Sequence, residues 1–139
     1  MCAQLLIQTF EDVSLDKFVS NLSPLICFRN WEQRFSSNYA EERYFRCLTL
    51  GLEITAAIAD DSEFKDYHYS LHFEPEASCK GDIEFCDGLA DCVARKLALS
   101  GFVVLRSLDF SRVGSGAVIY RSNPTEGTKP RDRVVTEEI

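Results

Sequence analysis

Two stretches of the chain alternate between apolar and polar residues, and this period of two constrains the fold more than any other feature. In the range 52–58 every second residue is apolar, beginning with Leu52 and ending with Ile58. In the range 67–74, aromatic and aliphatic residues alternate with His68, Ser70, His72 and Glu74. Successive side chains of a strand point to opposite faces of its sheet. The pattern therefore predicts neighbouring strands with one buried face and one wet face.

Other strands and two helices are expected around this pair. The strands are predicted over 5–10, 43–49, 102–110 and 117–122, with a strand or loop over 30–42 that ends in a turn near Ser37 and Asn38. A helix of about two turns follows the N-cap Ser14 and ends at Pro24. A second helix runs from Asp82 to about Ser100, where Gly101 stops it. Its apolar stripe is expected to include Phe85, Leu89, Cys92, Val93 and Leu97.

The order of these elements, β-α-βββ-α-ββ, predicts an α+β fold. We expect a two-layer sandwich with two helices on one face of a mostly antiparallel sheet, because both the helix stripes and the strand faces need a cover. Residues 1–122 form this single domain. Residues 123–139 contain two prolines and a glycine without apolar periodicity, which predicts a flexible C-terminal tail.

The composition and the cysteines favour a soluble cytoplasmic protein. The 139 residues are 45% hydrophobic, which is enough for a real core. The N-terminus lacks the basic region of a signal peptide, and no apolar stretch approaches the roughly 18 residues of a membrane span. The six cysteines form no C-x-x-C pair, so reduced thiols are expected rather than disulfides, with Cys92 in the core.

Nearly all of the net charge lies in one central segment. Residues 53–76 carry seven acidic residues and one lysine, a net charge of −6, whereas the rest of the chain carries 15 acidic and 14 basic residues. This segment would repel a phosphate backbone, so nucleic-acid binding is not expected. A basic protein partner is favoured, because opposite charge steers its approach.

The two histidines and the acids do not fit a metal site. On a strand, His68 and His72 would stand about 13 Å apart, too far to share one metal ion. We expect them on the wet face of the sheet. The acids from Asp60 to Asp66 lack the glycine and the spacing of a calcium loop. No strong catalytic or phosphate-binding motif is present, so no cofactor, metal or enzymatic activity is predicted.

The same segment supplies the residues expected to bind a partner. Its acids would pair with lysine or arginine, and the aromatic residues beside the turn would act as apolar anchors. The predicted binding residues are Glu53, Asp60, Asp61, Glu63, Phe64, Asp66, Tyr67, His68, His72 and Glu74.

A series of short strings in this region resembles small acidic bacterial proteins, many of them similar to immunity proteins of polymorphic or contact-dependent toxin systems. The resemblance runs from Asn38 to Glu74 and includes the strings Asn38-Tyr39, Arg43-Tyr44-Phe45, Gly51-Leu52-Glu53-Ile54, Ala59-Asp60-Asp61 and Phe64-Lys65-Asp66-Tyr67. It implies a cytoplasmic, non-enzymatic inhibitor that binds a cognate toxin domain. Immunity proteins share no common motif, so the resemblance assigns no residue a role by position.

Three functions follow as hypotheses. The first is the protein-binding inhibitor, which would occlude a basic surface of its partner. The second is a small-ligand-binding or enzymatic domain that uses His68, His72 and nearby carboxylates. The third is a structural subunit that oligomerises through an exposed edge strand. The sequence leaves the partner and the oligomeric state open.

Overall fold

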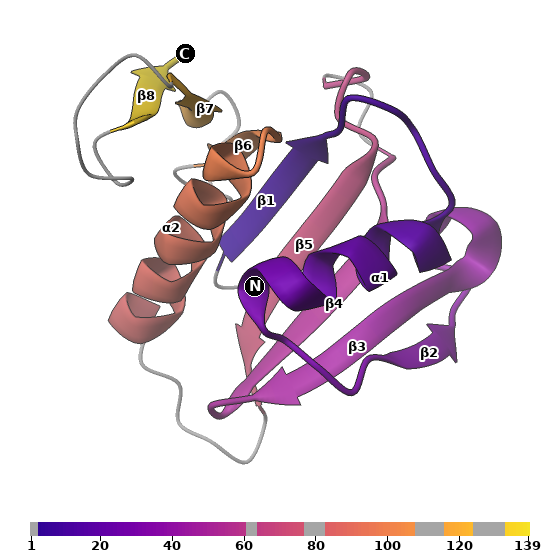
Figure 1. Cartoon of the computed structure of the whole chain (residues 1–139). Coiled ribbons are helices and arrows are strands. Elements are labelled where there is room, and N and C mark those ends of the chain that lie inside the picture. Colours follow the sequence, from indigo (N-terminus) through magenta and orange to yellow (C-terminus); the bar gives the residue numbers. More distant parts are fainter. Residues whose placement is uncertain (1–2, 61–63, 77–82, 108–115, 124–132) are drawn as a thin grey trace.

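A computed structural model of the chain describes residues 3–60, 64–76, 83–107, 116–123 and 133–139. These residues form eight strands, two α-helices and a short 3₁₀ helix (Figure 1). In chain order the elements are β1 (Ala3–Gln8), α1 (Leu15–Ile26), β2 (Glu32–Phe35), η1 (Ala40–Glu42), β3 (Arg43–Thr49), β4 (Leu52–Ile58), β5 (Tyr69–Pro75), α2 (Ile83–Leu99), β6 (Val103–Ser107), β7 (Ala117–Ser122) and β8 (Val134–Glu138).

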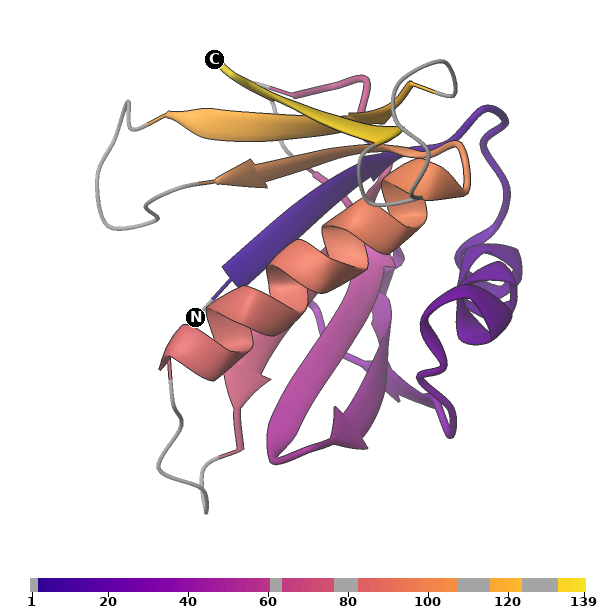
Figure 2. The same ribbon diagram turned by 60° about the vertical axis from the view of Figure 1, so that its left-hand side comes forward.

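All eight strands belong to one sheet with the order β2-β3-β4-β5-β1-β6-β7-β8. Every pair of neighbours is antiparallel. The sheet is twisted, and Figure 2 shows β6 and β7 fanned out from β3 and β4. The first strand of the chain lies near the centre of the sheet, between β5 and β6.

Both α-helices lie on the same face of this sheet, which confirms the predicted α+β fold with helices on one side. In Figure 1, α1 crosses in front of β3, β4 and β5, and α2 runs along β1. The main core fills the space between the two layers. Strand residues such as Leu5, Ile54 and Leu71 pack there against Phe18 and Leu22 of α1, all of them buried.

The three-strand meander β3-β4-β5 is the best-predicted part of the fold. Leu52, Ile54 and Ala56 of β4 point to the core, as the alternation indicates. The predicted hairpin turn lies at Leu50-Gly51, where both residues have positive φ, 52° and 74°. Positive φ at both central residues matches the right-handed twist of a two-residue hairpin.

The helix α1 is longer than predicted, because Pro24 lies inside it. Ser14 caps the helix as expected, with its side chain accepting from the backbone N–H of Lys17 at 3.2 Å. Pro24 costs one hydrogen bond within the helix, but it comes in the last turn, where Leu25 and Ile26 still pack against the core. The helix ends at Cys27, whose φ of 58° is left-handed.

The stripe that α2 presents to the core was predicted in part. Val93 and Leu97 are buried and Leu89 packs against the core, as predicted. Cys86, Ala90 and Ala94 are buried, whereas Phe85 and Cys92 are exposed. Small residues allow the helix to lie close to the sheet, a preference that a count of large apolar residues misses. The stop at Gly101 is confirmed. The N–H of Gly101 donates to Ala98 and that of Phe102 to Leu97, the paired bonds of a Schellman motif.

The tail predicted over 123–139 is in part a strand, so the prediction was wrong at its end. Residues Val134–Glu138 form β8, which pairs with β7 from Val118↔Glu138 to Ser122↔Val134. Val134 is 9% exposed and belongs to the main core. Residues 124–132 lie outside the described part of the chain. The strand β8 is therefore held by its pairing with β7 and by the burial of Val134, although its own sequence has no apolar periodicity.

A network of polar contacts joins α2 to the sheet. The hydroxyl of Tyr120 donates to Oδ1 of Asp91 over 2.7 Å, and Nε of Arg95 donates to Oδ2 of the same carboxylate over 2.9 Å. The Arg95 guanidinium also lies 5.6 Å from the centre of the Tyr120 ring. One turn earlier in the helix, Arg106 of β6 forms an ion pair with Asp87. These contacts fix the position of the helix along β6 and β7.

The cysteines do not all behave as predicted. Cys27, Cys47 and Cys92 are free thiols. Cys86, however, is disulfide-bonded, contrary to the expectation that the thiols are reduced. No helix in the described residues is long and apolar enough to cross a membrane.

Candidate functional site

The face of the sheet opposite the helices carries polar side chains along its central strands. Strand register places Thr55 of β4 beside His72 of β5, and His72 beside Gln4 of β1. Paired residues of antiparallel strands point to the same side, so these three form one row across the sheet. Ser70 of β5 lies two residues from His72 on this face, and both Thr55 and Ser70 are buried although they are polar.

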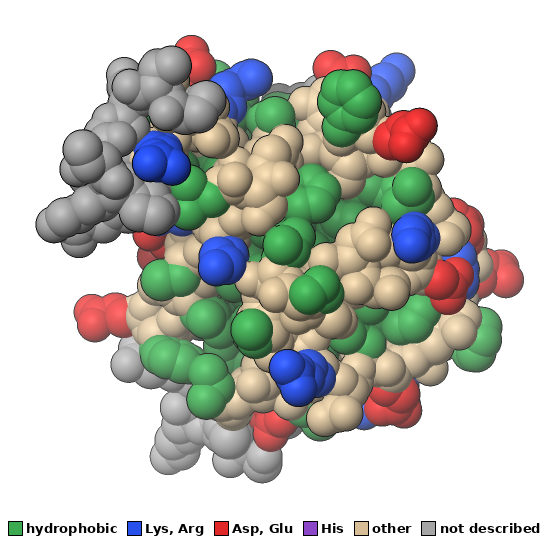
Figure 3. Space-filling model, in the orientation of Figure 1, with side chains coloured by type: hydrophobic (Ala, Val, Ile, Leu, Met, Phe, Trp, Pro, Cys, Tyr) green, Lys and Arg blue, Asp and Glu red, His purple; other side chains and the backbone are tan. Residues whose placement is uncertain are grey.

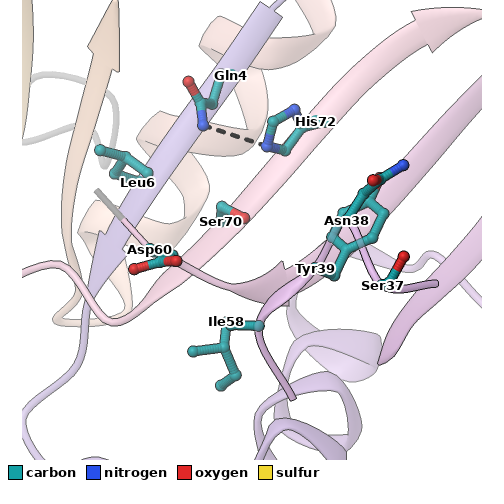
Figure 4. A pocket seen from close by; sticks show the side chains of 11 residues that line it. Gln4, Leu6, Ser37, Asn38, Tyr39, Ile58, Asp60, Ser70 and His72 are labelled. Atoms are coloured by element: carbon teal, nitrogen blue, oxygen red, sulfur yellow. Dashed lines mark hydrogen bonds between the residues drawn. The ribbon is translucent and has the colours of Figure 1, made fainter. Parts of the chain in front are cut away.

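A hollow of about 340 Å³ opens above this row (Figure 4). The sheet provides its floor, the segment between β2 and β3 provides one wall, and the end of β4 provides another. Its lining residues are Gln4, Leu6, Ser37, Asn38, Tyr39, Ala40, Ile58, Ala59, Asp60, Ser70 and His72. The hollow is at the small end of ligand-binding cavities, and most of its side chains are polar but uncharged.

Gln4 and His72 hold each other in the floor of the hollow. The amide nitrogen of Gln4 lies 3.2 Å from Nε2 of His72, as the dashed line in Figure 4 marks. In the neutral tautomer that carries its proton on Nδ1, Nε2 of His72 can accept a hydrogen bond from this amide group. Burial lowers the pKa of His72 from its ordinary value, although the negative charge of Glu74 opposes the shift. The wet-face position predicted for His72 is therefore partly covered.

Tyr39 forms the wall of the hollow that comes from the segment before β3. Its ring stacks on that of Tyr44, with 4.4 Å between the ring centres. The backbone of the segment is closed by hydrogen bonds from Ser36 to Glu42 and from Tyr39 to Ser36. Burial, the neighbouring Tyr44, and then the charges of Glu74 and Glu53 raise the pKa of the Tyr39 hydroxyl. The field of these two carboxylates thus acts on the wall of the hollow.

Glu53 and Glu74 face each other across β4 and β5. The register pairs them directly, on the same open face as the hollow. Like charges in this arrangement repel each other and cost stability. Asp60 lies just beyond the opposite end of β4, where it is exposed and lines the hollow. The described acids of the predicted binding set therefore lie at both ends of β4.

The remaining predicted binding residues are more dispersed. Phe64 and Tyr67 are half buried and pack against a second apolar cluster on the open face, formed by Leu6, Leu105, Ala117 and Ile119. Their rings meet edge to face with centres 6.3 Å apart. Asp66 is exposed, and Asp61 and Glu63 lie outside the described residues.

The two histidines occupy different surroundings. His68 precedes β5, makes an edge contact of 4.8 Å with the Tyr69 ring, and donates its backbone N–H to Ile7. It does not line the hollow that contains His72. Within the described ranges, no three His, Cys, Asp or Glu side chains are grouped so as to hold a metal ion.

Sequence reasoning missed several residues of the hollow, above all Gln4, Tyr39 and Ser70. Ser70 was visible as a polar position of the alternating strand, but nothing in the sequence marked it as buried. Gln4 and Tyr39 reach the site only because β1 pairs with β5 and the segment before β3 folds over the sheet.

A second groove lies on the helix side, between the end of α1 and the middle of α2. Its lining is mostly apolar, with Leu25, Ile26, Leu89 and Val93 beside the free cysteines Cys27 and Cys92. Figure 3 shows apolar side chains at the surface of this face, with basic side chains between them. The acidic pairing of Glu53 and Glu74 is on the other face.

Comparison with protein-family models, with curated proteins and with solved structures finds no match for this chain.

Proposed function

We propose that the protein binds a basic protein partner through the open face of its sheet and acts as a non-enzymatic inhibitor. The resemblance of residues Asn38 to Glu74 to immunity proteins suggests the kind of partner, a toxin domain whose basic surface would be occluded. The open face supports this proposal because the helices cover only the opposite side of the sheet. On this side Thr55 and Ser70 are buried, whereas Glu74 is exposed and Glu53 is half buried.

The observation that carries the proposal is the register of Glu53 with Glu74. The two carboxylates stand side by side on one face of the sheet, where Glu74 is exposed and Glu53 is half buried. Together they form an acidic patch, and a lysine or arginine from a partner could pair with both carboxylates at once.

The other acids extend the attractive field beyond this pair. Asp60 and Asp66 are exposed beyond the far end of β4, and the half-buried Phe64 and Tyr67 lie next to them. A basic partner would be steered by the charges and then pack on the sheet. Most of the effect of the charges is expected on the association rate, and it should weaken as salt screens them.

The test compares two double charge reversals. Glu53→Lys with Glu74→Lys alters the proposed surface, and Glu137→Lys with Glu138→Lys alters exposed acids of β8. Each pair changes the net charge from −7 to −3, so the total charge is matched. The genes that flank this one are first searched for a toxin-like domain; such a domain is then purified, and binding is measured by surface plasmon resonance at two salt concentrations.

We expect the first double variant to weaken binding by about tenfold or more, mainly through slower association, and the β8 variant to bind almost as the native protein does. Equal affinities for both variants would show that the Glu53–Glu74 pair is not part of the interface. A gene neighbourhood without any toxin-like domain would count against the inhibitor role itself.

A further inference from the structure

We infer that the hollow is a binding site for a guanidinium group, supplied by an arginine side chain of the protein partner. The source of the arginine rests on the proposed function, whereas the preference of the hollow for a guanidinium rests on its own residues. The site is distinct from the Glu53–Glu74 pair, although both lie on the same face of the sheet.

The hollow offers hydrogen-bond acceptors to a ligand. Ser70 is 4% exposed, and its hydroxyl lies 3.5 Å from the carbonyl oxygen of Ala57, at the outer limit of a hydrogen bond. A hydroxyl that donates in this way keeps both lone pairs for a donor in the hollow. The carboxylate of Asp60 lies at the rim. A cation with several N–H donors can use both acceptors, while an anion would meet two electron-rich oxygens.

The charges around the hollow also favour a cation. Its described lining contains the carboxylate of Asp60 and no lysine or arginine. The field of Glu53 and Glu74 reaches Tyr39 in the wall. Arg46 stands beside Thr55 on β3 and pairs with Glu32 at 3.3 Å. The N-terminal amino group adds a positive charge that acts on His72, opposite to the effect of Glu74. His72 is neutral and does not offset the negative potential.

The aromatic wall favours a guanidinium over an ammonium ion. Tyr39 lines the hollow, and its stacking with Tyr44 fixes the plane of its ring. A planar guanidinium stacks on an aromatic face while its edge donates hydrogen bonds, and it gives up its hydration more easily than an ammonium ion does. A lysine would gain the charge interaction with Asp60 but not the stacking.

The experiment uses the isolated full chain and three small probes. The ¹⁵N-labelled protein is titrated in NMR with Nα-acetyl-arginine methylamide, with its citrulline counterpart, and with its lysine counterpart. Citrulline has almost the same shape as arginine but no charge. We expect the arginine probe to shift the amide signals of residues around Tyr39, Asp60 and Ser70, with a dissociation constant of about 1 mM. The lysine probe should bind at least threefold more weakly, and citrulline should give no shifts at the same concentration.

Variants show whether the shifts arise in the hollow. Asp60→Asn and Ser70→Ala should each weaken the arginine probe by about fivefold or more, because the first removes the negative charge of the carboxylate and the second removes the hydroxyl acceptor. Glu138→Gln, which removes an exposed acid on β8, should leave the affinity unchanged. The inference is overturned if citrulline binds as well as arginine, if no probe shifts the signals of the hollow, or if Glu138→Gln weakens binding as much as Asp60→Asn.

These outcomes are independent of the test of the proposed function. Arginine binding in the hollow together with an unaltered partner affinity of the Glu53→Lys and Glu74→Lys variant would retain the guanidinium site and reject the docking surface. The reverse result would retain the docking surface and reject the guanidinium site.

Discussion

The hydroxyl of Tyr69 bonds both backbone groups of Val13, a residue 56 positions earlier in the chain. It accepts a hydrogen bond from the N–H of Val13 at 2.6 Å and donates one to the carbonyl oxygen of the same residue. The Tyr69 ring is fully buried and stacks on Phe18, with 4.0 Å between the ring centres. One side chain therefore fixes the beginning of α1 on the strand β5, whose other face forms the floor of the hollow.

Removing this hydroxyl should destabilise the protein. Tyr69→Phe leaves both backbone groups of Val13 without their partner in a partly buried place, at a cost of about 1–3 kcal/mol in the free energy of unfolding. Urea denaturation measures the change. Tyr67→Phe is the matched control, because its hydroxyl makes no hydrogen bond within the described residues, and it should cost less than about 0.5 kcal/mol. Equal losses for the two variants would contradict the structural role of the bonds to Val13.

The pKa of His72 predicts a pH dependence of stability. Burial lowers the pKa of His72 in the folded protein below the ordinary value of 6.5. The unfolded chain therefore binds the proton more tightly, and folding loses stability as the pH falls below about 6.5. His72→Asn should lose less stability than the native protein between pH 7 and pH 5, measured by urea denaturation.

The histidine signals in NMR provide the direct measurement. The Cε1–H signal of His72 should titrate below pH 6.5, and Gln4→Leu should alter its midpoint because Gln4 donates to the neutral ring. His68→Asn controls for the loss of a histidine as such. A native His72 that titrates above pH 6.5 would be incompatible with the neutral ring in the floor of the hollow.

Asp91 predicts a second pH dependence, at lower pH. Burial alone would raise its pKa, but hydrogen bonds from Tyr120 and Arg95 and the charges of Arg95 and Arg106 lower it below 3.8. Its contribution to stability is then present above pH 3.8 and is lost as the pH falls through the lowered value. Asp91→Asn should be less stable than the native protein at pH 7, and the difference should shrink at pH 2.5. A difference that is the same at both pH values would show that the charge of Asp91 is not what matters.

The two described glycines of α2 and its C-terminal turn should respond to alanine with opposite signs. Gly101 has a φ of 98°, which an alanine adopts only under strain, so Gly101→Ala should cost about 1–2 kcal/mol. Gly88 is exposed inside α2, and an added methyl group would have no atom within 4 Å. Gly88→Ala should add about 0.5–1 kcal/mol to the free energy of unfolding and so raise the melting temperature. Thermal unfolding of the two variants measures both changes. If both substitutions raised or both lowered the melting temperature, α2 would not end at Gly101 as described.

The sequence was most informative where one residue type decides the local structure. The alternation of β4 and β5, the turn at Leu50-Gly51 and the stop at Gly101 depend on neighbours in the chain, and all three were predicted. The core stripe of α2 was predicted only in part: Val93 and Leu97 are buried as expected, but the small residues Cys86 and Ala90, which are also buried, were missed. The strand β8 was missed, since its order comes from pairing with β7.

The same distinction holds for the candidate site: individual residues were predicted, but their arrangement in space was not. Acids such as Glu53 and Glu74 could be named from the charge distribution, but their register could not, because it depends on how β4 and β5 pair. The hollow was invisible from sequence, since Gln4, Tyr39 and His72 come from three distant segments.

The central place of β1 has a consequence for how the chain folds. Its two neighbours, β5 and β6, lie about 65 and 100 residues further along, whereas β3, β4 and β5 follow one another in the chain with connections of two and ten residues. The meander can form soon after it leaves the ribosome, but the hydrogen bonds of β1 to β6 must wait until residue 107 has been synthesised. Until then the edge of β1 that pairs with β6 has no hydrogen-bonding partner strand. Folding should therefore be limited by this late, long-range closure and should be slower than the size of the chain suggests.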